Sequence, residues 1–160
     1  MRTLLKLSAL GLTLLLPAYL AADVRWPGEG WEVRPTQMSY QELLSSLGAA
    51  IEAEEMAVVT EVGPTEAAAN RGVIIPGNRV VGVFRNDYAV QILSLSVPAM
   101  IEAPIRFYVT ENEDGSATLS WKTPSHVFAP YIEQAGPELE AVAVELDEIF
   151  AAIAERSLSE

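Results

Sequence analysis

The sequence has no cysteine among its 160 residues. Without thiols the chain cannot form a disulfide, a thiolate nucleophile, an iron–sulfur cluster or a cysteine-ligated zinc or haem site. It also has only one histidine, His126, which excludes a zinc site built on two histidines. The sequence therefore predicts no metal site and no cofactor.

Basic residues are scarce as well, with 10 against 22 acidic residues and a formal charge of −12. An acidic surface repels phosphate backbones and anionic lipids, so we expect no nucleic-acid partner. Half of the residues are apolar, and a chain of this length can bury one sizeable core. These properties predict one acidic, folded domain.

Sequence motifs that would identify a reaction are missing too. The chain contains no P-loop, no Gly-x-Ser-x-Gly nucleophile elbow and no His-Glu-x-x-His motif. Ser125 precedes His126, but adjacent residues on a helix do not face each other. The sequence therefore identifies no catalytic residue.

Residues 1–22 have the three parts of a secretory signal peptide. Arg2 and Lys6 form a positive end, residues 7–16 form a short apolar run, and a proline and small residues follow. We predict cleavage after Ala22, which makes the mature protein periplasmic or secreted and without stable membrane insertion. An uncleaved anchor is the alternative, although the apolar run is short for a bilayer.

The mature chain divides into a lead-in segment at residues 23–36, a single domain at residues 37–156 and a tail at residues 157–160. Proline and glycine interrupt the lead-in segment, so no long element is expected there. Residues 31–34 are predicted to form a short strand that ends at Pro35.

Two segments show the apolar periodicity of an amphipathic helix. Residues 39–56 begin with Ser39 and Glu42, which form a capping box, and residues 137–156 carry a regular apolar stripe. Shorter helices are expected at residues 65–71, at residues 88–97 with Asn86 as the N-cap, and between Pro124 and Pro130.

Strands are predicted from β-branched content and from alternation of apolar and polar residues. They span residues 56–62, 79–85, 105–109 and 117–121. Asp114-Gly115 predicts a hairpin between the last two. Because no regular βαβ repeat occurs, we predict an α+β fold, a single two-layer domain. Its sheet is antiparallel or mixed, has four or five strands, and carries helices mainly on one face.

The candidate ligand-binding residues are Arg85, Asn86, Asp87 and His126. The first three lie where a strand leads into a helix, and free amides at a helix N-terminus can hold an anion beside the charge of Arg85. The alternative is that Asn86 and Asp87 simply cap the helix. For His126 the alternative is a surface or capping histidine.

Two short motifs and the order of the elements suggest a family. Residues 84–87 read Phe-Arg-Asn-Asp where that family typically shows Phe-Gly-Asn-Pro, and residues 102–105 read Glu-Ala-Pro-Ile where it often shows Asp-Leu-Pro-Leu. Over residues 37–156 the chain resembles domain-of-unknown-function family 302. The resemblance implies a compact α+β domain that often occurs alone, and it implies a dimer. It brings no established activity and no catalytic residues.

The function that we predict is that of an exported module that binds a small ligand or an envelope protein, as a homodimer. The hairpin aromatics Phe107, Tyr108 and Trp121 are expected in the core or at the dimer interface rather than in a ligand cage. Two alternatives remain open, a carboxylate-based periplasmic enzyme and a structural subunit of an envelope complex.

Overall fold

The computed structural model describes residues 24–159, so the predicted signal peptide lies outside the described residues. One antiparallel sheet has the strand order β1-β5-β4-β3-β2. Its strands are β1 (Trp31–Ser39), β2 (Ala57–Val62), β3 (Asn78–Phe84), β4 (Ile105–Glu111) and β5 (Ser116–Lys122). The predicted α+β fold is confirmed, and the sheet is antiparallel throughout.

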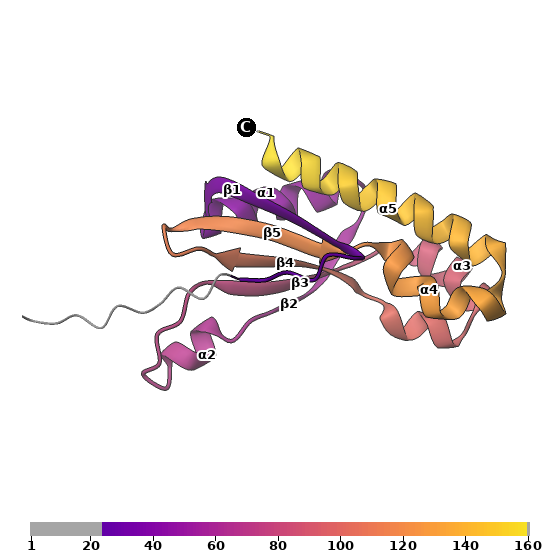
Figure 1. Cartoon of the computed structure of the whole chain (residues 1–160), viewed down its shortest axis with the longest axis horizontal. Helices are drawn as coiled ribbons and strands as arrows, with labels where there is room; N and C mark the ends of the chain where they lie inside the picture. Colours follow the sequence, from indigo (N-terminus) through magenta and orange to yellow (C-terminus); the bar gives the residue numbers. More distant parts are fainter. Residues whose placement is uncertain (1–23, 160) are drawn as a thin grey trace, which may run out of the picture.

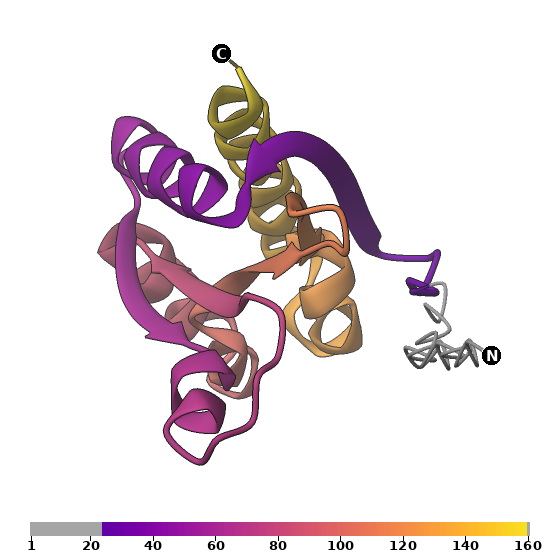
Figure 2. The same cartoon turned by 90° about the vertical axis from the view of Figure 1, so that its left-hand side faces the viewer.

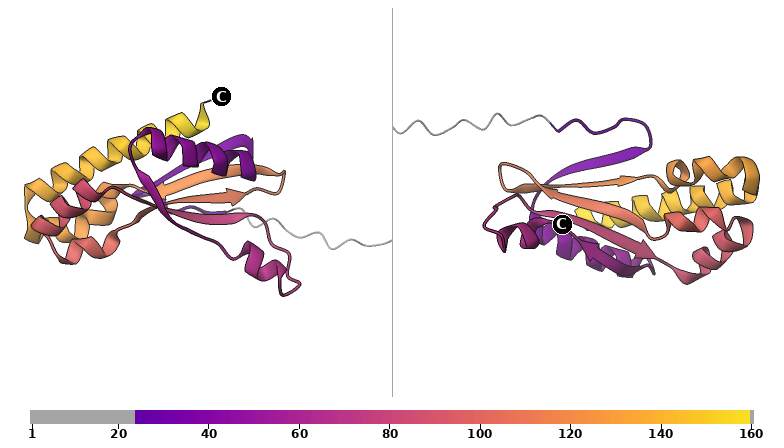
Figure 3. Two further views of the ribbon diagram at one scale, coloured as in Figure 1. Left: turned by 180° about the vertical axis from the view of Figure 1, so that it is seen from behind. Right: turned by 90° about the horizontal axis from the view of Figure 1, so that it is seen from below.

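The helices are arranged in two groups around this sheet (Figure 1). They are α1 (Tyr40–Ala53), α2 (Thr65–Ala69), α3 (Asn86–Leu95), the 3-10 helix η1 (Pro98–Glu102), α4 (Pro124–Ala135) and α5 (Pro137–Leu158). Helices α1 and α5 lie side by side over one face of the sheet, as Figure 3 shows from behind. Helices α3 and α4 gather beyond one end of the sheet, and α2 projects near the other end (Figures 1 and 2).

The first helix starts where the sequence predicts. The hydroxyl of Ser39 accepts a hydrogen bond from the amide of Glu42, and the Glu42 carboxylate accepts one from the amide of Ser39. This reciprocal capping box satisfies two amides that have no partner within the helix. The buried side chains Leu43, Leu47 and Ile51 then form the stripe by which α1 packs on the sheet.

Alternation along the strands separates a core face from an open face. On β4, Phe107 and Val109 are buried beneath the helices, while Arg106 and Tyr108 point to the opposite side because successive strand residues alternate. We call the side that faces away from α1 and α5 the open face. The core residue Phe107 stacks on Phe150 of α5 with ring centroids 4.7 Å apart, which joins the sheet to the longest helix.

Three predicted boundaries were wrong. Strand β1 continues through Pro35 to Ser39, because β1 is an edge strand and a missing amide on the outer edge breaks no ladder bond. Helix α4 continues past Pro130 to Ala135. Helix α5 continues to Leu158, so part of the predicted tail is helical. Within residues 24–159, no helix is both long enough and apolar enough to cross a bilayer.

Candidate functional site

The predicted corner at the start of α3 is closed by its own ion pair. The guanidinium Nε of Arg85 lies 2.9 Å from a carboxylate oxygen of Asp87, and its Cζ lies 4.3 Å from the ring centroid of Tyr88. The same Asp87 oxygen accepts a hydrogen bond from the amide of Tyr88 at 2.9 Å. Asn86 is the first helical residue and Arg85 is the N-cap, so the prediction of Asn86 as N-cap was wrong. The cation of this corner therefore already has a carboxylate partner.

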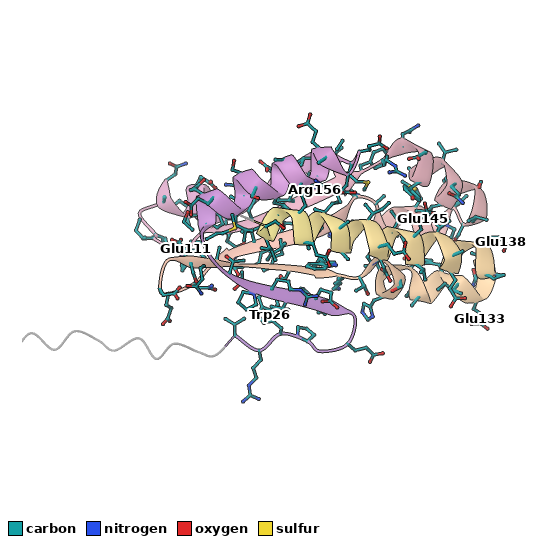
Figure 4. The ribbon with its side chains drawn as sticks, turned by 90° about the horizontal axis from the view of Figure 1, so that it is seen from above. Trp26, Glu111, Glu133, Glu138, Glu145 and Arg156 are labelled. Carbon is teal, nitrogen blue, oxygen red and sulfur yellow. The ribbon has the colours of Figure 1, made fainter. Side chains whose placement is uncertain are left out.

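The next residue ties the corner to the longest helix. Tyr88 is buried, and its hydroxyl donates a hydrogen bond to the carboxylate of Glu145 on α5, which Figure 4 labels. Burial, and then the hydrogen bond to Glu145, raise the pKa of Tyr88 to about 12. The hydrogen bond of Arg85 lowers the pKa of Asp87. These contacts indicate a structural role, in which Tyr88 connects α3 to α5.

The shifted phenol predicts a specific loss of stability in alkali. The unfolded chain loses the Tyr88 proton near pH 10 and the folded chain near pH 12. The free energy of unfolding should therefore be unaffected by this group below pH 10 and should fall as the pH rises to about 12. In Tyr88→Phe this part of the fall should disappear, as measured by urea unfolding at stepped pH. Ultraviolet titration in which every tyrosine ionises together near its ordinary pKa would contradict the prediction.

His126 supports the lead-in segment rather than the corner. Its ring lies against Gly30, where an added Cβ would come within 2.0 Å of the imidazole Cγ. The amide of Thr123 donates to the carbonyl of Gly30 at 2.9 Å, and the hydroxyl of Thr123 accepts from the amide of His126 at 3.4 Å. Gly30 also has a φ of +71°, which favours glycine. Within residues 24–159, the contacts of His126 and those of the Arg85 corner have no residue in common.

The described carboxylates with shifted pKa values serve as caps and ion pairs. The pKa is lowered for Glu42, Glu66, Asp87 and Asp114, and all four side chains are exposed. A carboxylate that acts as a general acid needs the opposite shift. Within residues 24–159, no group of three or more histidine, aspartate or glutamate side chains could hold a metal ion.

The open face contains a hollow of about 430 Å³ that none of the predicted site residues lines. It lies where β4 begins after η1 and β5 ends before α4. It is lined by Trp31, Asn78, Val80, Glu102, Ile105, Arg106, Phe107, Tyr108, Trp121, Lys122 and Val127. We call it the open-face hollow. Its size and its mixture of aromatic, aliphatic and a few polar groups are typical of small-molecule sites.

Strand pairing brings two cations together at this hollow. Phe107 of β4 pairs with Trp121 of β5, so Arg106 and Lys122, one residue further along, lie opposite each other on the open face. Trp31 of β1 pairs with Lys122, whose ammonium lies 5.7 Å from the indole centroid. Two positive charges therefore lie opposite each other on β4 and β5, beside the aromatic ring of Trp31, which begins the aromatic wall of the hollow.

Trp26 of the lead-in segment extends that wall. Its ring centroid lies 5.6 Å from that of Trp31 on β1 and 6.1 Å from that of Tyr108 on β4. Strand β5 runs between those two strands, so Trp26 crosses over β5, where Ser120 is fully buried despite lying on the open face. Figure 4 shows Trp26 between the lead-in segment and β1. The tryptophan-containing part of this segment thus packs on the sheet.

The polar rim of the hollow is set by two short hydrogen bonds. The side-chain Nδ2 of Asn78 donates a hydrogen bond to the hydroxyl of Tyr108 at 2.6 Å, which fixes the Tyr108 ring beside the hollow. The carboxylate of Glu102 accepts from the hydroxyl of Tyr131 on α4 at 2.7 Å. The one carboxylate that lines the hollow is therefore held by a neighbouring phenol.

Together, the fold and this hollow define the class of protein: a single-sheet α+β domain with a small-molecule-sized hollow on its open face. The chain belongs to the family of domain of unknown function DUF302, whose model matches residues 31–156. This confirms the family resemblance.

A solved structure shows the same fold. It is described as the crystal structure of an uncharacterized conserved protein DUF302 from Bacillus stearothermophilus. The TM-score is 0.70 at 15% identity, and the match covers 81% of this chain and 98% of that chain. At this identity the likeness establishes the fold alone. The comparison with curated proteins finds no match.

Proposed function

We propose that this chain is an exported module that binds a small molecule in the open-face hollow. The observation that carries the proposal is an aromatic wall beside two cations, Arg106 and Lys122, around about 430 Å³ of open space. Within residues 24–159 neither cation forms an ion pair. Val80 of β3 and Val127 of α4 add apolar residues to the lining, so a ligand in the hollow would bury apolar surface against the protein. Export and homodimer formation remain predictions from the sequence.

The proposal predicts that a neutral aromatic probe binds at one site. Two of the three tryptophans of the chain, Trp31 and Trp121, line the hollow, and the third, Trp26, packs on Trp31. Phenylnaphthylamine should therefore bind saturably to the mature protein, quench its tryptophan fluorescence and become fluorescent itself. Val80 lines the hollow from β3, and replacing it with tryptophan would fill the space. Val80→Trp should weaken probe binding about tenfold or more.

A matched control lies one strand away in the same row of the sheet. Val62 of β2 pairs with Val80, is exposed and does not line the hollow. Val62→Trp should therefore bind the probe as the wild type does. If the wild type shows no saturable binding, or if both variants bind equally well, the proposed site is wrong.

A further inference from the structure

We propose that the ligand of the open-face hollow is a small organic anion. Its negative group would lie between Arg106 and Lys122, and its flat apolar body would lie against Trp31 and Tyr108. This inference rests on the proposed function, because it assigns a chemical class to the ligand of that same site.

The first argument is that these two cations have no counterion. Arg34, Arg79, Arg85 and Arg156 each form an ion pair with a carboxylate. Among residues 24–159, Arg25, Arg71, Arg106 and Lys122 form none, although the whole chain has 22 acidic residues and only 10 basic ones. Of these four cations, only Arg106 and Lys122 line the hollow. In such a chain, two unpaired cations at one hollow leave a local positive charge that an anion can neutralise.

The second argument is the cost of the arrangement. Like charges directly opposite each other on neighbouring strands destabilise a sheet. Arg106 and Lys122 are placed in this way by the register of β4 and β5, and the Glu102 carboxylate at the same hollow is held by Tyr131. A bound anion would convert this repulsion into two attractions, because each cation would then face a negative group.

The third argument concerns the rest of the ligand. The hollow is lined in part by the aliphatic residues Val80 and Val127 and by the aromatic residues Trp31 and Tyr108. A fully hydrated inorganic anion would leave this apolar lining in water, whereas a planar organic anion would cover it. A polyanion such as nucleic acid is disfavoured by the net charge of −12. The chemistry therefore fits an aromatic or otherwise flat carboxylate, sulfonate or phosphate ester of small size.

The test compares two probes that differ only in charge. Anilinonaphthalene sulfonate has the ring system of phenylnaphthylamine with one added sulfonate. The wild type should bind the sulfonate about tenfold more tightly than the neutral probe. Added salt should weaken the binding of the sulfonate and leave the binding of the neutral probe unchanged. In the double variant Arg106→Gln/Lys122→Gln, the ratio of the two affinities should fall to about one. Val80→Trp should weaken the binding of both probes.

Arg71 supplies the matched control, since it is an exposed cation outside the hollow and its replacement removes a positive charge elsewhere. Arg71→Gln should keep the wild-type ratio of affinities. If the neutral probe binds in the hollow and the sulfonate binds no more tightly, the anion inference is wrong while the proposed function stands. If neither probe binds, both the anion inference and the proposed function are wrong. Salt titration of the wild type gives an independent answer should the double variant fold poorly.

Discussion

Replacing Phe150 with alanine should lower the free energy of unfolding by about 3–5 kcal/mol. The Phe150 ring is fully buried and stacks on Phe107 with an interplanar angle of 17°. Phe107 in turn lies 5.5 Å from Trp121, measured between ring centroids. Truncation would therefore remove the aromatic contact that joins α5 to the centre of the sheet and would leave a cavity in a packed core.

The measurement is urea unfolding of the mature protein followed by circular dichroism. Val144 supplies the control, because it lies on the same helix and is 49% exposed. Val144→Ala should change the free energy of unfolding by no more than about 0.5 kcal/mol. Phe150→Leu, which removes less volume, keeps the comparison measurable if the alanine variant does not fold. A Phe150→Ala variant as stable as Val144→Ala would show that α5 is not anchored through this ring.

Elements controlled by neighbouring residues could be predicted from the sequence. The capping box at Ser39 and Glu42 joins groups only three positions apart, and it starts α1 as expected. At the hairpin, Gly115 has a φ of +82°, which a residue without a side chain adopts at little cost. Signals of this kind are local, so they need no knowledge of the rest of the fold.

The strand order could not be predicted, because it depends on contacts between distant parts of the chain. Strand β1 pairs with β5, which places Trp31 beside Lys122. Nothing near Trp31 in the sequence indicates that neighbour. The sequence therefore assigns residues 31–36 to the lead-in segment, with no more than a short strand at residues 31–34. This pairing brings Trp31 to the open-face hollow, whose other lining residues come from β3, η1, β4, β5 and α4. No local sequence signal therefore reveals the hollow.

Part of the site was nevertheless within reach of the sequence. Alternation along the hairpin places Phe107 and Trp121 on one face, as their burial confirms, and Arg106 and Lys122 on the other. The predicted hairpin turn sets those two cations opposite each other. The prediction instead treated Tyr108 together with Phe107 and Trp121, although neighbouring strand residues face opposite sides.

Pro130 shows how tertiary packing overrides a local signal, and it leads to the second large prediction. Proline inside a helix costs about 3 kcal/mol, because it lacks an amide and its ring crowds the carbonyl four residues earlier. Helix α4 nevertheless continues through Pro130, with Phe128 fully buried and Tyr131 bonded to Glu102. These contacts on both sides of the proline hold the helix together.

Pro130→Ala should therefore raise the free energy of unfolding by about 2 kcal/mol, measured by urea unfolding. The new amide can donate to the carbonyl of His126, and the gain stays below 3 kcal/mol because proline also stiffens the unfolded chain by roughly 0.4–1 kcal/mol. Pro130→Gly restores the same amide but has a lower helix propensity, so its gain should be about 1 kcal/mol smaller. If the alanine variant is no more stable than the wild type, proline does not destabilise α4 at this position and the prediction is wrong.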